Sequence, residues 1–164
     1  MQVWRKLKGL GALYLQQSVC LLPDLPAVAA TVTELGERVQ ADGGRMRVVH
    51  IDVVDEGERR ELAGEMTAAV DAEYAEVLER LPSFFAELEM ESERGRAIFA
   101  EVEESEADLE RFRSWVAKIG ARDYFGAPQG DQVRGELARA GEALAAFETA
   151  ALAGEDTDGT NGSS

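Results

Sequence analysis

The sequence contains a single cysteine, Cys20, and a single histidine, His50, among its 164 residues. One cysteine excludes an internal disulfide and a cysteine-based zinc site. Because Cys20 stands in an apolar run, we expect a buried thiol that packs as a small hydrophobic side chain rather than a reactive one. One histidine leaves no basis for a Ser-His-Asp set. A metal or catalytic role for His50 would need carboxylates that folding brings to it.

Long apolar runs and basic residues are also scarce. No run approaches the ~18 apolar residues that a bilayer-spanning helix requires. The first 15 residues, MQVWRKLKGLGALYL, mix charges with apolar residues and offer no cleavage site, so they do not form a secretory signal. The chain contains 17 Lys and Arg and 32 Asp and Glu, which gives a net charge of −15. This charge repels nucleic acid phosphates and anionic membranes. It argues against DNA binding by the chain alone and favours a cytoplasmic protein.

Glycine-rich phosphate loops are absent as well. The segment Asp42-Gly43-Gly44 ends a predicted helix and precedes a predicted strand, which is the reverse of the order in a phosphate-binding loop. The carboxylate pairs Glu61–Glu65 and Glu73–Glu76 lack a histidine partner, so they do not indicate acid–base chemistry. The sequence therefore predicts no cofactor, no metal site and no catalytic residue.

The first 54 residues are predicted to form five short elements. Apolar spacing indicates a helix at 3–10, strands at 12–15 and 19–22, a helix at 25–41 and a strand at 45–54. Asp24 is the expected N-cap of the second helix, with Pro26 in its first turn. The order αββαβ corresponds to a ferredoxin-like βαββαβ fold without its first strand. His50 is expected beneath another element of this unit.

From Glu56 onward the sequence is rich in Glu, Ala and Arg at helical spacing. An apolar stripe runs from Leu62 to Leu81, and Pro82 is expected to kink or end that helix. A short helical piece around Phe84–Leu88, a solvated link at 91–94, a helix at 98–119 and a turn at 123–128 follow. A last helix is predicted at 133–151. We therefore expect an α+β, mostly helical protein with three or four C-terminal helices. It comprises a ferredoxin-like unit at 1–54, a helical extension at 55–153 packed on it as one domain, and a disordered tail at 154–164.

The segment VWRKLKGLGALYLQQSVCLLP, residues 3–23, carries a resemblance to a known family. It resembles the N-terminal domain of chromate-resistance regulators of the ChrB type, in its helix-to-strand passage and in its strand that ends Leu-Leu-Pro. The segments 72–74, 109–119 and 122–127 are similar too, so the resemblance covers residues 1–152. The family's first strand and its C-terminal domain do not occur in this sequence.

A weaker likeness links the chain to the sheet domain of phenylacetate-pathway repressors and to small CRISPR-associated endoribonucleases. The metal-binding Asp of those nucleases follows the strand that is missing here, so nuclease chemistry is not carried over.

Two clusters of basic residues beside a tryptophan are the candidate sites. Arg5, Lys6 and Lys8 lie next to Trp4 and would contact an anion or nucleic acid, or simply form a solvated helix face. Arg111, Trp115, Lys118 and Arg122 are spaced to share one helix face. Chromate is a tetrahedral dianion, which such a cationic fork with an indole wall would bind. Alternatively, these cations pair with Glu104, Asp108 and Glu110.

The resemblance implies a non-enzymatic regulatory or sensor module that is cytoplasmic. Such a module would serve the chromate response or transcriptional regulation through protein association. A homodimer or a regulatory protein partner is expected, with chromate or another oxyanion as ligand. The alternatives are a ferredoxin-like enzyme and a DNA-binding regulator that acts alone.

Overall fold

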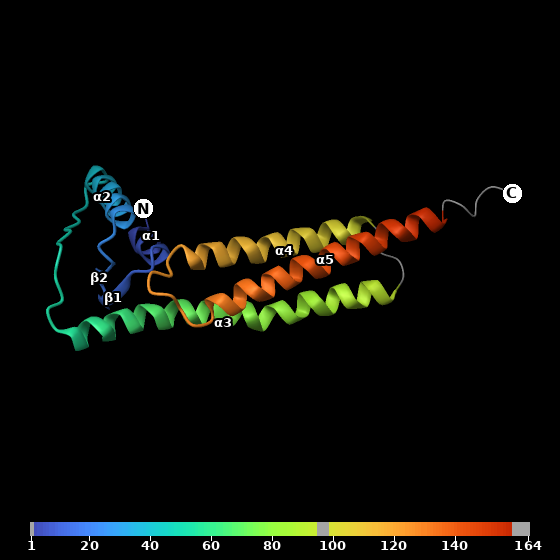
Figure 1. The fold of residues 1–164 in the computed structure, drawn as a ribbon. Helices are drawn as coiled ribbons and strands as arrows, with labels where there is room; N and C mark the ends of the chain where they lie inside the picture. Colours follow the sequence, from blue (N-terminus) through green and yellow to red (C-terminus); the bar gives the residue numbers. More distant parts are fainter. Residues whose placement is uncertain (1, 95–98, 159–164) are drawn as a thin grey trace. The chain divides into compact units, whose positions relative to one another are not determined.

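A computed structural model describes residues 2–94 and 99–158 of the chain (Figure 1). It divides into two compact units. The first, here called the N-terminal unit, combines Met1–Val70 with Ala121–Ala127, and the second, the helical unit, combines Asp71–Gly120 with Pro128–Ser164. Helices account for 72% of the structure, which confirms the prediction of a mostly helical protein with a small sheet. The predicted packing of a helical extension on a unit ending at residue 54 stays a prediction.

The N-terminal unit begins with a short helix and a hairpin, as the sequence predicts. Helix α1 spans Val3–Gly9, and strands β1 (Leu13–Gln16) and β2 (Val19–Leu21) pair antiparallel. Leu13 lies opposite Leu21, and Tyr14 lies opposite Cys20. The ladder is irregular between Tyr14 and Gln16. These bounds agree with the predicted helix and strands to within about one residue.

Helix α2 spans Pro26–Ala41 and confirms the predicted helix at 25–41. Pro26 occupies the first helical position, where its missing N–H costs no hydrogen bond. The helix ends in a Schellman motif, because Gly43 adopts φ +80° and the Gly44 N–H donates to the Val39 carbonyl at 2.8 Å. The predicted Asp24 cap is wrong. Leu25 holds the N-cap position without a side-chain hydrogen bond, and the Asp24 carboxylate instead lies 2.9 Å from His50 Nδ1.

Residues 44–55 form neither helix nor strand, so the strand predicted at 45–54 is wrong in this structure. Alternating apolar residues suit a strand, but a strand also needs a neighbour for its backbone. In the described part of the chain the sheet contains β1 and β2 alone. The ferredoxin-like arrangement, which requires this strand in the sheet, is therefore not confirmed. His50 is also not covered by another element, since 69% of its side chain is exposed.

The helical unit is built from the last part of α3 (Glu56–Glu93), α4 (Phe99–Gly120) and α5 (Gly130–Asp158). These helices run beside one another and turn their apolar stripes inward (Figure 1). Its most deeply buried large side chains are those of Tyr74, Val77, Leu81, Leu109, Ile119 and Val133. The stripes predicted from helical spacing therefore form the core.

Three boundaries differ from the predicted ones. Helix α3 continues through Pro82 and through most of the predicted link at 91–94. Helix α5 runs to Asp158, so the disorder predicted from residue 154 is wrong up to that point. At 91–93 and past residue 154, each added residue gains a backbone hydrogen bond without any apolar contact, which explains these extensions. Pro82 has no N–H to donate, and α3 continues through it because Leu81, Phe84 and Leu88 on either side are buried in the core. Ile98, where the next helix was predicted to begin, and the tail from 159 to 164 lie outside the described residues.

Candidate functional site

Helix α1 presents the first predicted cluster to solvent. Val3 and Leu7 are half-buried, whereas Arg5, Lys6 and Lys8 are exposed on the remaining surface. Within the described residues, none of these three cations forms an ion pair. Lys6 and Lys8 lie in the last turn of the helix, where a positive charge favours the helix dipole.

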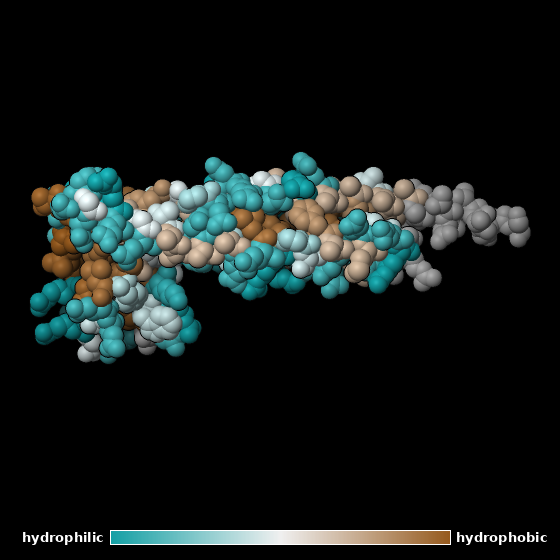
Figure 2. All heavy atoms as spheres, turned by 90° about the horizontal axis from the view of Figure 1, so that it is seen from below, coloured by the Kyte–Doolittle hydropathy of each residue, from teal (hydrophilic) through white to brown (hydrophobic). Residues whose placement is uncertain are grey.

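Trp4 lies beside these cations and leaves 56% of its surface exposed. Its carbonyl accepts a hydrogen bond of 3.4 Å from the Tyr14 hydroxyl, which ties α1 to the hairpin. Leu15 and Val19 of the hairpin are also exposed. Figure 2 shows hydrophobic surface, in brown, among the polar atoms at the left of the view, where Figure 1 places the N-terminal unit. We name Trp4, Arg5 and Lys8 the α1 face, since helical spacing places these three residues on one side of α1.

The distribution of charge along the chain singles out the same region. Residues 1–51 contain six basic residues (Lys and Arg) and four acidic residues (Asp and Glu). Residues 52–164 contain 11 basic and 28 acidic residues. The N-terminal segment is therefore weakly basic in a strongly acidic chain. The net charge of the whole chain conceals this difference, and a count by segment finds it from the sequence.

The second predicted cluster is spread over two units. Arg111, Trp115 and Lys118 lie on α4 in the helical unit, and Arg122 follows the helix in the N-terminal unit. Arg111 forms an ion pair with Asp108, one turn earlier, as one of the two predicted alternatives has it. Anion binding by this cluster stays a prediction.

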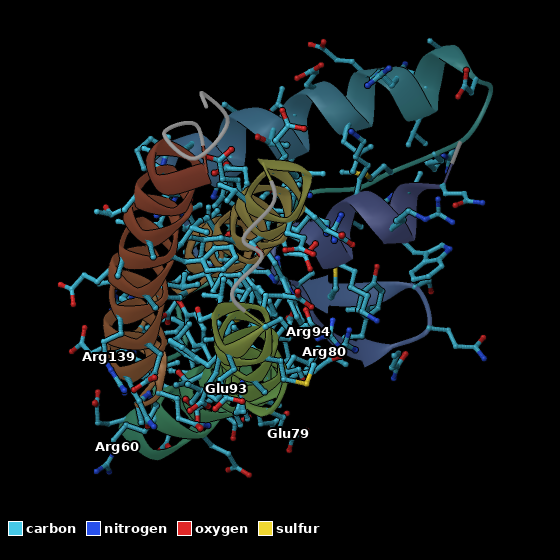
Figure 3. All side chains as sticks on the ribbon, turned by 90° about the vertical axis from the view of Figure 1, so that its right-hand side faces the viewer. Arg60, Glu79, Arg80, Glu93, Arg94 and Arg139 are labelled. Atoms are coloured by element: carbon cyan, nitrogen blue, oxygen red, sulfur yellow. The ribbon has the colours of Figure 1, made fainter. Side chains whose placement is uncertain are left out.

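Trp115 is half-buried, and its ring contacts other side chains of the helical unit. It stacks on Phe112 with ring centroids 6.5 Å apart, and Phe112 meets the edge of Phe84. The guanidinium of Arg80, labelled on α3 in Figure 3, lies 5.2 Å from the Trp115 ring centroid. A cation over an indole face is attracted by the ring quadrupole. Trp115 thus takes its cation from α3, a partner that spacing along α4 could not predict.

A groove of about 540 Å³ lies between α3 and α5 in the helical unit. Its lining includes the apolar Pro82 and Phe85 and the charged Glu136 and Arg139. Arg139 (Figure 3) donates to Glu136 at 2.8 Å, and its guanidinium lies 5.8 Å from the Phe85 ring centroid. Its charge is therefore already engaged within the groove.

The imidazole of His50 contacts one carboxylate, that of Asp24, and both side chains are mostly exposed. No group of three His, Cys, Asp or Glu in residues 2–94 and 99–158 is placed to hold a metal ion. Cys20 is half-buried in β2, and burial raises the pKa of its thiol. A raised pKa lowers the fraction of reactive thiolate at neutral pH.

Two of the segments that carry the family resemblance meet in the N-terminal unit. Gly11 adopts φ +81°, and a Cβ at this position would lie 3.1 Å from Arg122 Cβ. The Asp123 carboxylate accepts hydrogen bonds from the backbone N–H groups of Gly126 and Ala127, at 3.0 and 2.8 Å. This Asx-type turn presents Tyr124 toward Leu10. The shared motifs therefore build one structural junction.

Comparison with known proteins gives one match. The family model described as "Protein ChrB, N-terminal" matches residues 1–156 of the chain. No curated protein and no solved structure matches the chain. Among the described residues, every helix is too short or too polar to cross a membrane.

Proposed function

We propose a function for this chain from its family: it belongs to the ChrB N-terminal family, whose members are chromate-resistance regulator-like domains. We propose that the chain is a non-enzymatic regulatory domain that acts by binding another macromolecule. The α1 face is the surface through which it binds. The observation that carries this proposal is the exposure of Trp4 next to Arg5 and Lys8, which have no ion-pair partner among the described residues.

The chemistry of the α1 face suits a partner with an acidic or anionic surface. Tryptophan and arginine are enriched at binding hot spots because they combine apolar area with hydrogen-bond donors. Basic side chains steer an anionic partner toward this face despite the acidic remainder of the chain. The partner that we favour is a regulatory protein, since the total charge of −15 opposes DNA binding by the chain alone.

The test uses the organism that encodes the chain. Its chromosomal copy is replaced by the variant Trp4→Ala/Arg5→Gln/Lys8→Gln, and the transcripts that respond to chromate are measured by RNA sequencing. We expect the chromate response to change as it does in a deletion strain, at unchanged protein abundance. The matched control, Leu152→Ala/Arg60→Gln/Arg94→Gln, alters one exposed apolar residue and two exposed cations elsewhere.

The two parts of the proposal fail separately. A deletion strain with an unaltered chromate response would overturn the regulatory role. If the deletion changes the response and the α1 variant does not, the role of the α1 face is wrong and the regulatory role stands.

Direct sensing of chromate is the finer form of this function. Within the helical unit, Arg111, Trp115 and Lys118 of α4 are the candidate oxyanion site, and an oxyanion there would compete with Asp108 for Arg111. Calorimetric titration of the purified chain with chromate, and with sulfate as a matched dianion, tests it. We expect chromate binding that Arg111→Gln/Lys118→Gln abolishes and Arg5→Gln/Lys8→Gln does not. Titrations without heat would refute direct sensing.

The alternative of a DNA-binding regulator that acts alone is tested in the same preparation. Labelled duplex from upstream of the chain's own gene is titrated at about physiological ionic strength and followed by fluorescence anisotropy. We expect no binding by the isolated chain. Tight binding that Arg5→Gln/Lys8→Gln weakens would replace the protein partner with DNA.

A further inference from the structure

The segment 45–55, in the N-terminal unit, combines strand-forming residues with an unpaired backbone. Five of its residues are β-branched, namely Val48, Val49, Ile51, Val53 and Val54. Val49 exposes 74% of its surface, Ile51 62% and Val54 87%. Such a run is an open template for pairing with another strand. Hydrophobic surface reaches the left-hand end of Figure 2, the end at which Figure 1 draws this segment.

The backbone hydrogen bonds of this segment occur at its end next to α3. The carbonyls of Val53 and Asp55 both accept from Arg59, at 2.7 Å from its guanidinium and 3.0 Å from its N–H. Within the described residues, the backbone groups of positions 47–52 and 54 form no hydrogen bond, and these include the even positions 48, 50, 52 and 54. In a strand, successive residues direct their backbone groups to opposite edges. The even positions therefore share an edge that is still available for pairing.

The sequence of residues 47–55, RVVHIDVVD, is complementary to its own reverse. When two copies run antiparallel about Ile51, each Arg47 lies opposite Asp55 of the other copy, and each His50 lies opposite Asp52. Val49 then faces Val53, Val48 faces Val54, and Ile51 faces itself. Every cross-strand pair joins opposite charges, a histidine with a carboxylate, or two apolar residues, and such pairs stabilise a ladder.

We propose that the segment 47–55 pairs antiparallel with the same segment of a second copy, about a two-fold axis at Ile51, so that the chain forms a homodimer. A two-fold interface presents the same patch on both subunits, which is what a self-complementary strand provides. This interface uses other residues than the α1 face, so the test of the dimer and the test of the proposed function have independent outcomes.

The complementary residue pairs specify the register, and the hydrogen bond from Arg59 to Val53 agrees with it. In the pairing about Ile51, the even residues point their backbone groups at the partner, and the odd residues point theirs back at their own subunit, where Arg59 already binds Val53 and Asp55. Ile51 then forms a non-hydrogen-bonded pair, in which side chains approach most closely. A shift of the axis to His50 would set Val48 against Asp52 and Arg47 against Val53. That register loses the complementary charges at Arg47.

Sedimentation of the full chain over about a hundredfold range of concentration tests the dimer. We expect a monomer–dimer equilibrium. The variant Ile51→Asp places two carboxylates at the axis and should raise the dimer dissociation constant about tenfold or more. The control Leu152→Asp introduces the same change at a position that is also 62% exposed, on α5, and should leave the constant within about twofold.

Each sedimentation outcome decides the proposal. A wild-type chain that stays monomeric throughout the range would overturn it. A dimer that Ile51→Asp weakens no more than Leu152→Asp would place the interface elsewhere and would overturn it too. Circular dichroism and thermal melting of both variants show whether each has kept its fold, and the exposure of the two side chains predicts that each does.

Disulfide cross-linking tests the register. In a Cys20→Ser background, Ile51→Cys places two thiols directly opposite each other, within the Cα separation that a disulfide needs. Val49→Cys places them four residues apart, or about 14 Å along the strand. We expect mild oxidation to give a covalent dimer with Ile51→Cys and not with Val49→Cys. Equal cross-linking of both variants, or of neither, would refute the pairing about Ile51.

Discussion

The phenolic hydroxyl of Tyr124 donates a hydrogen bond to the main-chain carbonyl of Leu10 at 2.5 Å, although 114 residues separate them. Tyr124 belongs to the turn 121–127, and Leu10 to the junction between α1 and β1. Burial raises the pKa of Tyr124, and Arg122 opposes part of that rise. This contact closes the N-terminal unit across a long interval of sequence.

Tyr124→Phe removes this hydrogen bond and keeps the ring. We expect the free energy of unfolding to fall by about 1 kcal/mol, the usual net value of one such bond. Urea titration followed by circular dichroism measures the change. A variant as stable as the wild type would show that the bond contributes nothing to stability.

The same variant changes the dependence of stability on alkaline pH. Because the pKa of Tyr124 is higher in the folded chain than the value of about 10 in the unfolded chain, its contribution is complete below that pH. It is lost as the pH rises through the raised, folded-state pKa. The stability difference between wild type and Tyr124→Phe should therefore shrink above about pH 10. A difference that stays constant up to strongly alkaline pH contradicts the assignment.

Gly11→Ala should destabilise the N-terminal unit for two reasons. At φ +81° a side chain costs about 1–2 kcal/mol, and its Cβ would also lie 3.1 Å from Arg122 Cβ. Gly43→Ala is the matched control, since Gly43 has φ +80° and no neighbouring atom within 4 Å of a Cβ. Denaturant titration of both variants should show a larger loss for Gly11→Ala. Equal losses would mean that contact with Arg122 imposes no cost.

Asp71 holds the start of α5 against α3 inside the helical unit. Its carboxylate accepts hydrogen bonds from the Gln129 N–H at 2.8 Å and from Gln129 Nε2 at 2.9 Å. Hydrogen bonds to a charged group contribute about 1.5–3 kcal/mol, so Asp71→Ala should lower the free energy of unfolding by an amount in this range. Glu79→Ala, at an exposed position on α3 (Figure 3), should change it by less than about 0.5 kcal/mol. Similar losses in thermal melts of the two variants would refute the role of Asp71.

Cys20 should react slowly with alkylating reagents at neutral pH. Burial in β2 limits access to its thiol and raises its pKa, which leaves little thiolate. Mass spectrometry of the native chain after iodoacetamide treatment should show slower labelling than in the unfolded chain. Labelling at equal rates in both states would show a freely reactive thiol.

Helical elements could be predicted from the sequence because their signal is local. Spacing of apolar residues located α1 and α2, and the stripes on α3, α4 and α5 proved to be the core. The misplaced end beyond residue 154 concerns a position where helix continuation depends on backbone hydrogen bonds rather than on apolar contacts. Helix α3 instead passes Pro82 because the apolar side chains on either side of it are buried.

Features that depend on distant partners could not be predicted. The alternation at 45–54 indicated a strand, but alternation does not say which chain supplies the neighbour. Spacing along α4 placed Arg111 beside Trp115, whereas the cation over the indole ring is Arg80 of α3. The Asp24 side chain was expected to cap α2 and instead meets His50, 26 residues later. Each difference involves a contact that only the folded chain establishes.

The return of residues 121–127 to the N-terminal unit has a consequence for synthesis on the ribosome. The α1–hairpin junction is translated early, but Tyr124 leaves the exit tunnel only after α3 and α4 have been made. At roughly 5–20 residues per second, this delay of 114 residues is about 6 to 23 seconds. Throughout it, Leu10 and Gly11 lack the turn that closes their unit. The nascent chain therefore completes its first-made unit late, during a period in which chaperones have access to it.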